Sequence, residues 1–257
     1  NPYSEMDADF FSFKKSAQKE VNYLVKEFES KKSAGNYARA TTSRTGVLDT
    51  TKLINYRFSE DLFKKVTVVP DGKNHGLVFI LDWSGSMNNV MMDTIKQLYN
   101  LIWFCRKVQI PYDVYAFTND FARDNREESL YEKKNHLAEV PDTFSLLNFF
   151  NSKTRSKDLD TQMLNIWRSA CVFNWNYHTP WVDVPIGMRL SGTPLNEVMI
   201  CLHQLIPDFK TRTGAEKVQC VVLTDGESQA MTYHRLVKRD WEDCDYLGRN
   251  YFANGCV

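Results

Sequence analysis

The segment Leu77-Val78-Phe79-Ile80-Leu81-Asp82-Trp83-Ser84-Gly85-Ser86 decides the predicted fold, because an uninterrupted apolar run ends in a cluster of polar residues. A continuous apolar run is typical of a strand that is buried on both faces of a parallel sheet. Residues 88–105 follow with apolar side chains at helical spacing, and residues 112–117 form the next predicted strand. Strand, helix and strand in this order make a βαβ unit. We therefore predict an α/β fold with a doubly wound, mostly parallel sheet and helices on both faces.

The rest of the chain divides into two predicted regions. Residues 1–75 form an N-terminal helical extension, in which a long amphipathic helix over residues 4–34 packs on the domain and a polar linker covers residues 35–47. Residues 76–257 form the α/β domain. Further predicted elements are a shorter helix after Asp49, an extended stretch over 66–69, a loop over 119–143, a strand over 144–150, helices over 161–173 and 195–206, and a buried strand over 218–223.

Composition excludes several classes of protein. The chain carries 32 basic and 32 acidic residues, so its formal net charge is zero, whereas nucleic-acid-binding domains usually have a basic excess. No apolar stretch is long enough to cross a bilayer. The six cysteines include no C-x-x-C pair, and no N-x-[ST] glycosylation site occurs, so we predict a reducing, cytoplasmic environment. Because Asn1-Pro2-Tyr3 includes no initiator Met, we expect an internal piece of a longer protein.

Polar residues cluster where the predicted buried strands end. Asp82, Ser84 and Ser86 follow the first of these strands directly, and Asp225 follows the last. In doubly wound sheets, ligands bind beyond the carboxyl ends of the strands, where the strand order reverses. Thr193 precedes a predicted helix and adds a further hydroxyl from a loop.

Two carboxylates and three hydroxyls form a ligand set that suits a hard divalent cation. Mg²⁺ prefers oxygen ligands and keeps several of its waters, so few protein ligands are enough. We predict a site for Mg²⁺, or for Mn²⁺ or Ca²⁺, with an open position for a carboxylate of another molecule. Its predicted ligands are Asp82, Ser84, Ser86, Thr193 and Asp225.

The same residues also allow other interpretations. The D-x-S-x-S pattern alone is also common in ordinary turns, and its context between an apolar strand and a helix favours the metal site. A serine hydrolase would need G-x-S-x-G, which neither Ser84 nor Ser86 satisfies, and no phosphate-binding loop for ATP is present. The five histidines have no zinc-binding spacing. We therefore predict no catalytic residues and no activity of the chain alone.

Asp82-x-Ser84-x-Ser86, Thr193 and Asp225 resemble the metal-ion-dependent adhesion site of von Willebrand factor A domains. The resemblance covers roughly residues 76–240 and implies a Rossmann-like A domain. In that family the two serine hydroxyls usually bind the ion directly, and the other positions bind directly or through water. The chain ends before the final strand of such a domain, so we expect an incomplete version of the fold.

A narrower resemblance involves residues 48–53, the metal motif and residues 110–118, which look like the cobaltochelatase subunit CobT and its relatives in bacteria and their phages. Those proteins work beside a ring-forming AAA+ ATPase of the MoxR or CobS type. The resemblance implies an accessory subunit that docks an acidic residue of such a ring or of its client. The alternative is a subunit of a chelatase complex that inserts cobalt or magnesium into a tetrapyrrole.

An aromatic cluster begins in the predicted helix over residues 161–173 and continues toward Thr193. Packing in the core or in a loop is the favoured interpretation, and a protein-binding surface is the alternative, since Trp and Tyr are enriched at binding hot spots. Its members are Trp167, Phe173, Trp175, Tyr177 and Trp181.

Overall fold

The computed structural model describes residues 3–39, 41–48, 63–68, 74–119, 138–141, 143–173, 185, 187–237 and 246–251. The chain divides into two compact units, of which one contains residues 1–21 and 74–257 and the other residues 22–73. The long first helix, α1 (Ser4–Arg39), contributes to both units.

The first unit is built on a four-stranded sheet with the strand order β6-β4-β3-β7. The central strand β3 runs parallel to β4 and to β7, whereas β6 pairs antiparallel with β4. The α/β prediction is therefore confirmed, with a sheet that is mixed. The four strands are β3 (His75–Asp82), β4 (Tyr112–Asn119), β6 (Phe144–Asn151) and β7 (Lys217–Leu223).

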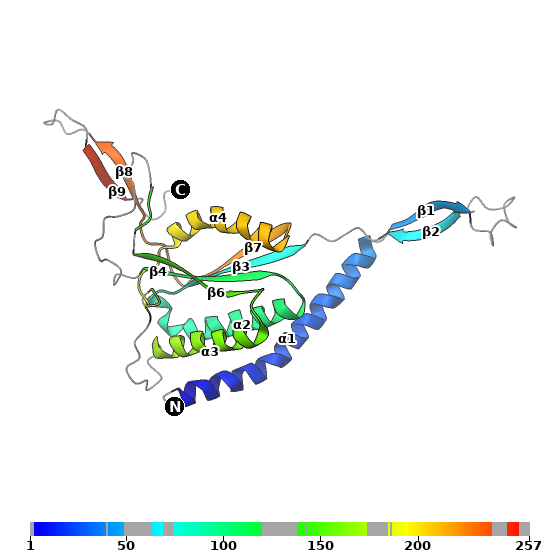
Figure 1. The fold of residues 1–257 in the computed structure, drawn as a ribbon, viewed down its shortest axis with the longest axis horizontal. Helices are drawn as coiled ribbons and strands as arrows, with labels where there is room; N and C mark the ends of the chain where they lie inside the picture. The colour runs from blue at the N-terminus through cyan, green and yellow to red at the C-terminus, as the bar shows by residue number, and fades with distance from the viewer. Residues whose placement is uncertain are drawn as a thin grey trace. The chain divides into compact units, whose positions relative to one another are not determined.

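Helices lie on both sides of this sheet (Figure 1). Helix α4 (Leu195–Thr213) covers one face, and α2 (Met91–Lys107) and α3 (Ser156–Phe173) lie together on the other. A short 3₁₀ turn, η2 (Ser86–Asn89), connects β3 to α2. Helix α4 continues beyond its predicted end at residue 206 through Pro207, and it ends at Gly214, which has the left-handed conformation (φ 71°) that favours glycine.

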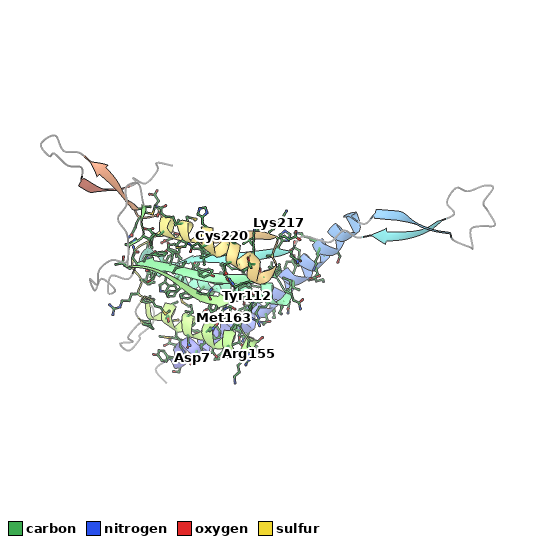
Figure 2. The ribbon with its side chains drawn as sticks, turned by 45° about the horizontal axis from the view of Figure 1, so that its top comes forward. Asp7, Tyr112, Arg155, Met163, Lys217 and Cys220 are labelled. Carbon is green, nitrogen blue, oxygen red and sulfur yellow. The ribbon has the colours of Figure 1, made fainter. Side chains whose placement is uncertain are left out.

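Strand β7 differs from its prediction. We predicted a buried strand, but Lys217, Gln219 and Cys220 are exposed and the other residues are only half-buried. Figure 2 labels Lys217 and Cys220 of this strand. The reason is its position, since β3 is its only partner among the described residues and β7 therefore forms an edge of the sheet. An apolar run alone does not distinguish an edge strand from a central one.

The face covered by α2 and α3 has a core rich in aromatic side chains. Trp167 is buried and packs against Phe10 of α1 and Tyr99 of α2, with ring centroids 5.6 and 6.3 Å away. The buried hydroxyl of Tyr99 donates to the backbone oxygen of Met163 at 2.7 Å. The predicted packing of the first helix on the domain is thus confirmed for its first half, which buries Met6, Phe10, Ala17 and Val21.

The structure describes two positions of the aromatic cluster. Trp167 lies in this core, whereas Phe173 is half-buried and makes an edge-to-face contact with Trp83 at 6.0 Å. Trp175, Tyr177 and Trp181 lie outside the described residues.

The opposite face has a smaller core under α4. Buried residues of β3, β4 and α4 form this cluster, and half-buried side chains of β6 and β7 pack around it. Its buried members are Val78, Ile80, Phe117, Val198, Leu202, Phe209 and Ala215.

The predicted linker over residues 35–47 is wrong. Helix α1 continues to Arg39, and β1 (Thr41–Leu48) pairs antiparallel with β2 (Phe63–Val68) in the second unit. Polar composition suggested a linker, but a stretch rich in Thr is also compatible with a short two-stranded ribbon. The helix predicted after Asp49 lies outside the described residues, as does most of the loop predicted over 119–143.

A three-stranded antiparallel sheet, in the order β5-β8-β9, also belongs to the first unit; β5 lies between β4 and β6 in the sequence, whereas β8 and β9 follow β7. Its strands are β5 (Ala138–Glu139), β8 (Thr232–Val237) and β9 (Tyr246–Tyr251). Within the described residues, none of the helices combines the length and the apolar character that a membrane crossing requires.

Candidate metal centre

Asp82 is the last residue of β3 and its side chain is completely buried, with an exposed fraction of 0%. Its Oδ2 accepts a hydrogen bond of 2.6 Å from the Thr224 hydroxyl, which follows the end of β7. Its Oδ1 is buried with no hydrogen-bond partner among the described residues. Burial raises the pKa of Asp82, the hydrogen bond from Thr224 lowers it in part, and the nearby charge of Asp225 raises it further.

Three more of the predicted ligands are linked to one another beside Asp82. The Ser84 and Ser86 hydroxyl oxygens lie 3.0 Å apart, and the Ser86 hydroxyl donates to Oδ1 of Asp225 at 2.9 Å. Ser84 is buried, whereas Asp225 is exposed on the rim. The carboxyl ends of β3 and β7 bring these groups together because the two strands are parallel neighbours.

Thr193 reaches the same rim through its backbone. The loop that carries it forms a bridge between Ser191 and Ser84, in which the Gly85 amide donates to the Ser191 oxygen at 2.8 Å. The hydrogen bonds of the described side chains do not include the Thr193 hydroxyl. The structure therefore links three predicted ligands by hydrogen bonds, has Asp82 beside them at the end of β3, and brings the loop of Thr193 to the same rim.

The residues fit a divalent cation with oxygen ligands. A buried carboxylate normally needs a positive partner, because removing a charge from water is costly. In the part of the chain that the structure describes, no Lys, Arg or His forms an ion pair with Asp82 or Asp225. The unpartnered Oδ1 of Asp82 and the paired hydroxyls are the oxygen donors that Mg²⁺ or Mn²⁺ prefers.

A site built mainly from Cys, His or carboxylates is not present in the described residues, where no three such side chains come together. The cluster at Asp82 has only two carboxylates, and hydroxyls supply the other oxygens. This composition is compatible with an ion that keeps several waters.

Several residues around the five predicted ligands were not predicted from the sequence. Thr224, in the Leu223-Thr224-Asp225-Gly226 turn, directly contacts Asp82, although only its neighbour Asp225 was predicted as a ligand. Asn119, Ser228 and Gln229 also hydrogen-bond around the loop of Thr193. The available signal was their position, since Asn119 ends β4 and the other two closely follow β7.

Comparisons of the chain with protein-family models, with curated proteins and with solved structures found no match.

Proposed function

We propose that this chain is a metal-dependent protein-interaction domain, of the doubly wound von Willebrand A type, that docks an acidic residue of a partner. The observation that carries the proposal is the buried carboxylate of Asp82, which lies beside the hydrogen-bonded group of Ser84, Ser86 and Asp225 and has no cationic side chain paired with it among the described residues. Such a group is expected either to take up a proton or to bind a cation.

The proposed roles of the residues follow from their positions. Asp82 supplies the buried negative charge, and Thr224 orients it by donating to Oδ2. Ser84 and Ser86 offer neutral oxygens, so only Asp82 and Asp225 offset the charge of a divalent cation, and an open coordination position could take a further carboxylate. Asp225 stands on the exposed side of the cluster, where an incoming carboxylate would arrive. A bound Mg²⁺ would supply the positive centre that such a carboxylate needs.

The proposed partner is an AAA+ ATPase of the MoxR or CobS type, or its client. Support for this partner comes from the resemblance of residues 48–53 and 110–118 to the CobT-like proteins. The same resemblance supports the alternative, a subunit of a cobalt or magnesium chelatase complex.

Calorimetric titration with MgCl₂ and MnCl₂ tests the site. We expect binding by the wild type and none by Asp82→Asn, which keeps the shape of the side chain but removes its charge. Asp208→Asn is the matched control, because Asp208 is an exposed aspartate of α4 whose side chain is 60% exposed. Equal binding by Asp82→Asn and the wild type would refute the proposed site.

A pull-down tests the docking function. Wild-type protein and Asp82→Asn are each immobilised and compared in Mg²⁺ and in EDTA. We expect an AAA+ ATPase to be retained only by the wild type in Mg²⁺. Retention of tetrapyrrole-synthesis enzymes under that condition would favour the chelatase alternative, and equal retention in EDTA would contradict metal-dependent docking.

A further inference from the structure

The loop of Thr193 is hydrogen-bonded to the segment that follows β7. The Gln229 amide donates to the Thr193 oxygen at 3.0 Å, and the Asn196 side-chain amide donates to the Gln229 oxygen at 3.1 Å. The Asn196 backbone amide donates to the Ser228 hydroxyl at 3.1 Å. This last bond caps α4 from outside the helix, since Pro194 at the N-cap position provides no side-chain cap.

The Gln229 side chain is itself held from a third element. Asn119, at the end of β4, is 5% exposed, and its Nδ2 donates to Oε1 of Gln229 at 2.8 Å. The other end of this amide, Oδ1 of Asn119, is buried with no hydrogen-bond partner among the described residues. The bond to Gln229 therefore fixes how the buried Asn119 amide is oriented.

Gly192 makes room for this side chain. A Cβ atom at Gly192 would lie 2.2 Å from Nε2 of Gln229, so the glutamine amide lies directly against the backbone of the residue before Thr193. The Gln229 side chain thus spans from the end of β4 to the Thr193 loop, and its backbone holds the same loop by a second contact.

We propose that Gln229 is a positioning residue that sets the Thr193 hydroxyl at the metal site, with Asn119 as its anchor. This inference rests on the proposed function. Thr193 is the one predicted ligand that precedes a helix and does not closely follow a strand, so its position depends on what holds its loop. Gln229 follows Asp225 by four residues, so one short segment carries a ligand and also positions another. Residues that orient metal ligands typically change metal affinity 10–100-fold when they are replaced.

The test measures the Mn²⁺ dissociation constant of the intact chain, together with its melting temperature. Gln229→Met keeps the size of the side chain and removes its amide, and we expect Mn²⁺ binding about tenfold weaker with a nearly unchanged melting temperature. Gly192→Ala pushes the flexible end of Gln229 away, so it should have a similar effect, and combining the two changes should add little. Gln204→Met, at an exposed glutamine of α4, is the control and should bind like the wild type.

A double-mutant cycle separates positioning from general stability. In the Thr193→Ala background, Gln229→Met should cause no further loss of Mn²⁺ affinity, because the hydroxyl that it positions is already absent. If Thr193→Ala weakens binding but Gln229→Met does not, or if the two losses simply add, the positioning role is wrong and the proposed site stands. If the wild type binds no Mn²⁺, both the inference and the proposed function are overturned.

Discussion

Two buried aspartates lie at opposite ends of the main sheet, and they differ in the side chains that contact their carboxylates. Asp113, near the start of β4, is 1% exposed, and its Oδ2 lies 2.6 Å from a guanidinium nitrogen of Arg212. Asp82, at the end of β3, is equally buried, but its Oδ2 accepts a hydrogen bond from the neutral hydroxyl of Thr224 and has no cationic partner among the described residues. Each carboxylate also has a buried Oδ1 without a hydrogen-bond partner among the described residues.

The two carboxylates differ in whether a cationic side chain balances their charge. At the amino end of the strands, α4 ends with its own cation, so the charge of Asp113 is balanced within the chain, and Arg212 also contacts Asp208. The pKa of Arg212 is raised by its hydrogen bonds to Asp113 and Asp208, so the guanidinium beside Asp113 keeps its positive charge. At the carboxyl end of the strands, no cationic side chain among the described residues forms an ion pair with Asp82. A balanced buried charge supports the fold, whereas an unbalanced one is expected where a ligand brings the missing charge.

The largest expected effect is stabilisation by Mg²⁺. A ligand that binds only the folded state stabilises by about 2.7 kcal/mol at a concentration 100 times its dissociation constant. We expect this gain for the wild type and for Asp113→Asn, and none for Asp82→Asn. Urea unfolding with and without Mg²⁺ measures it. A gain by Asp82→Asn would place the binding site elsewhere.

Replacing Asp113, the aspartate paired with Arg212, should have the next largest effect on the free energy of unfolding. Asp113→Asn leaves the Arg212 guanidinium beside a neutral amide, and breaking a buried ion pair is strongly destabilising. Because Arg212 is one-third exposed and keeps its contact with Asp208, we expect a loss of about 2 kcal/mol in the free energy of unfolding. Urea unfolding in EDTA checks this value, and a loss below the error of the measurement would show that the pair contributes nothing.

The fold was predictable as far as local patterns extend. The apolar run before Asp82 and the strand over residues 112–117 gave the parallel pair of β3 and β4, because neighbouring strands in a βαβ unit leave a clear pattern. The edge position of β7 was not predictable, since it depends on which strand lies beside it. The extent of α1 was also missed, because Gly35 and Asn36 are poor helix formers and therefore suggested an earlier end of the helix.

The candidate site could be predicted for residues that directly follow a strand. Asp82, Ser84, Ser86 and Asp225 come together for this reason, whereas their role as metal ligands remains a prediction. Gln229 could not be predicted, because its contacts join three segments that lie far apart in the sequence. No local spacing rule indicates such a contact.

Asp82→Asn should change the free energy of unfolding by less than Asp113→Asn does, and in the opposite direction. In EDTA, Asp82→Asn replaces a buried charge without a cationic partner by a neutral amide of the same shape, and the amide oxygen can still accept from Thr224. We expect the free energy of unfolding to rise by about 1 kcal/mol, since a buried charge without compensation is destabilising. The same urea experiment that shows a loss for Asp113→Asn should therefore show a gain here. Destabilisation by both variants would mean that the two aspartates play the same structural part.

The smallest expected effect on stability is that of Thr193→Ala. Thr193 is half-buried in a rim loop, and the contacts described for it use its backbone oxygen, which alanine retains. Substitutions away from cores, caps and buried networks usually change stability by about 0.5 kcal/mol or less, so the melting temperature should stay near that of the wild type.

Docking of the partner should respond to Thr193→Ala much more strongly than stability does. The variant lacks one oxygen of the proposed metal shell but keeps Asp82 and Asp225. A partner carboxylate held mainly by the cation should then bind much more weakly, so the variant in Mg²⁺ should retain as little partner as the wild type in EDTA. A pull-down combined with thermal melting measures both effects on the same samples. If Thr193→Ala melts normally and still retains the partner at full strength, the docking surface does not use this hydroxyl. If EDTA also has no effect on the wild type, docking does not depend on the metal at all.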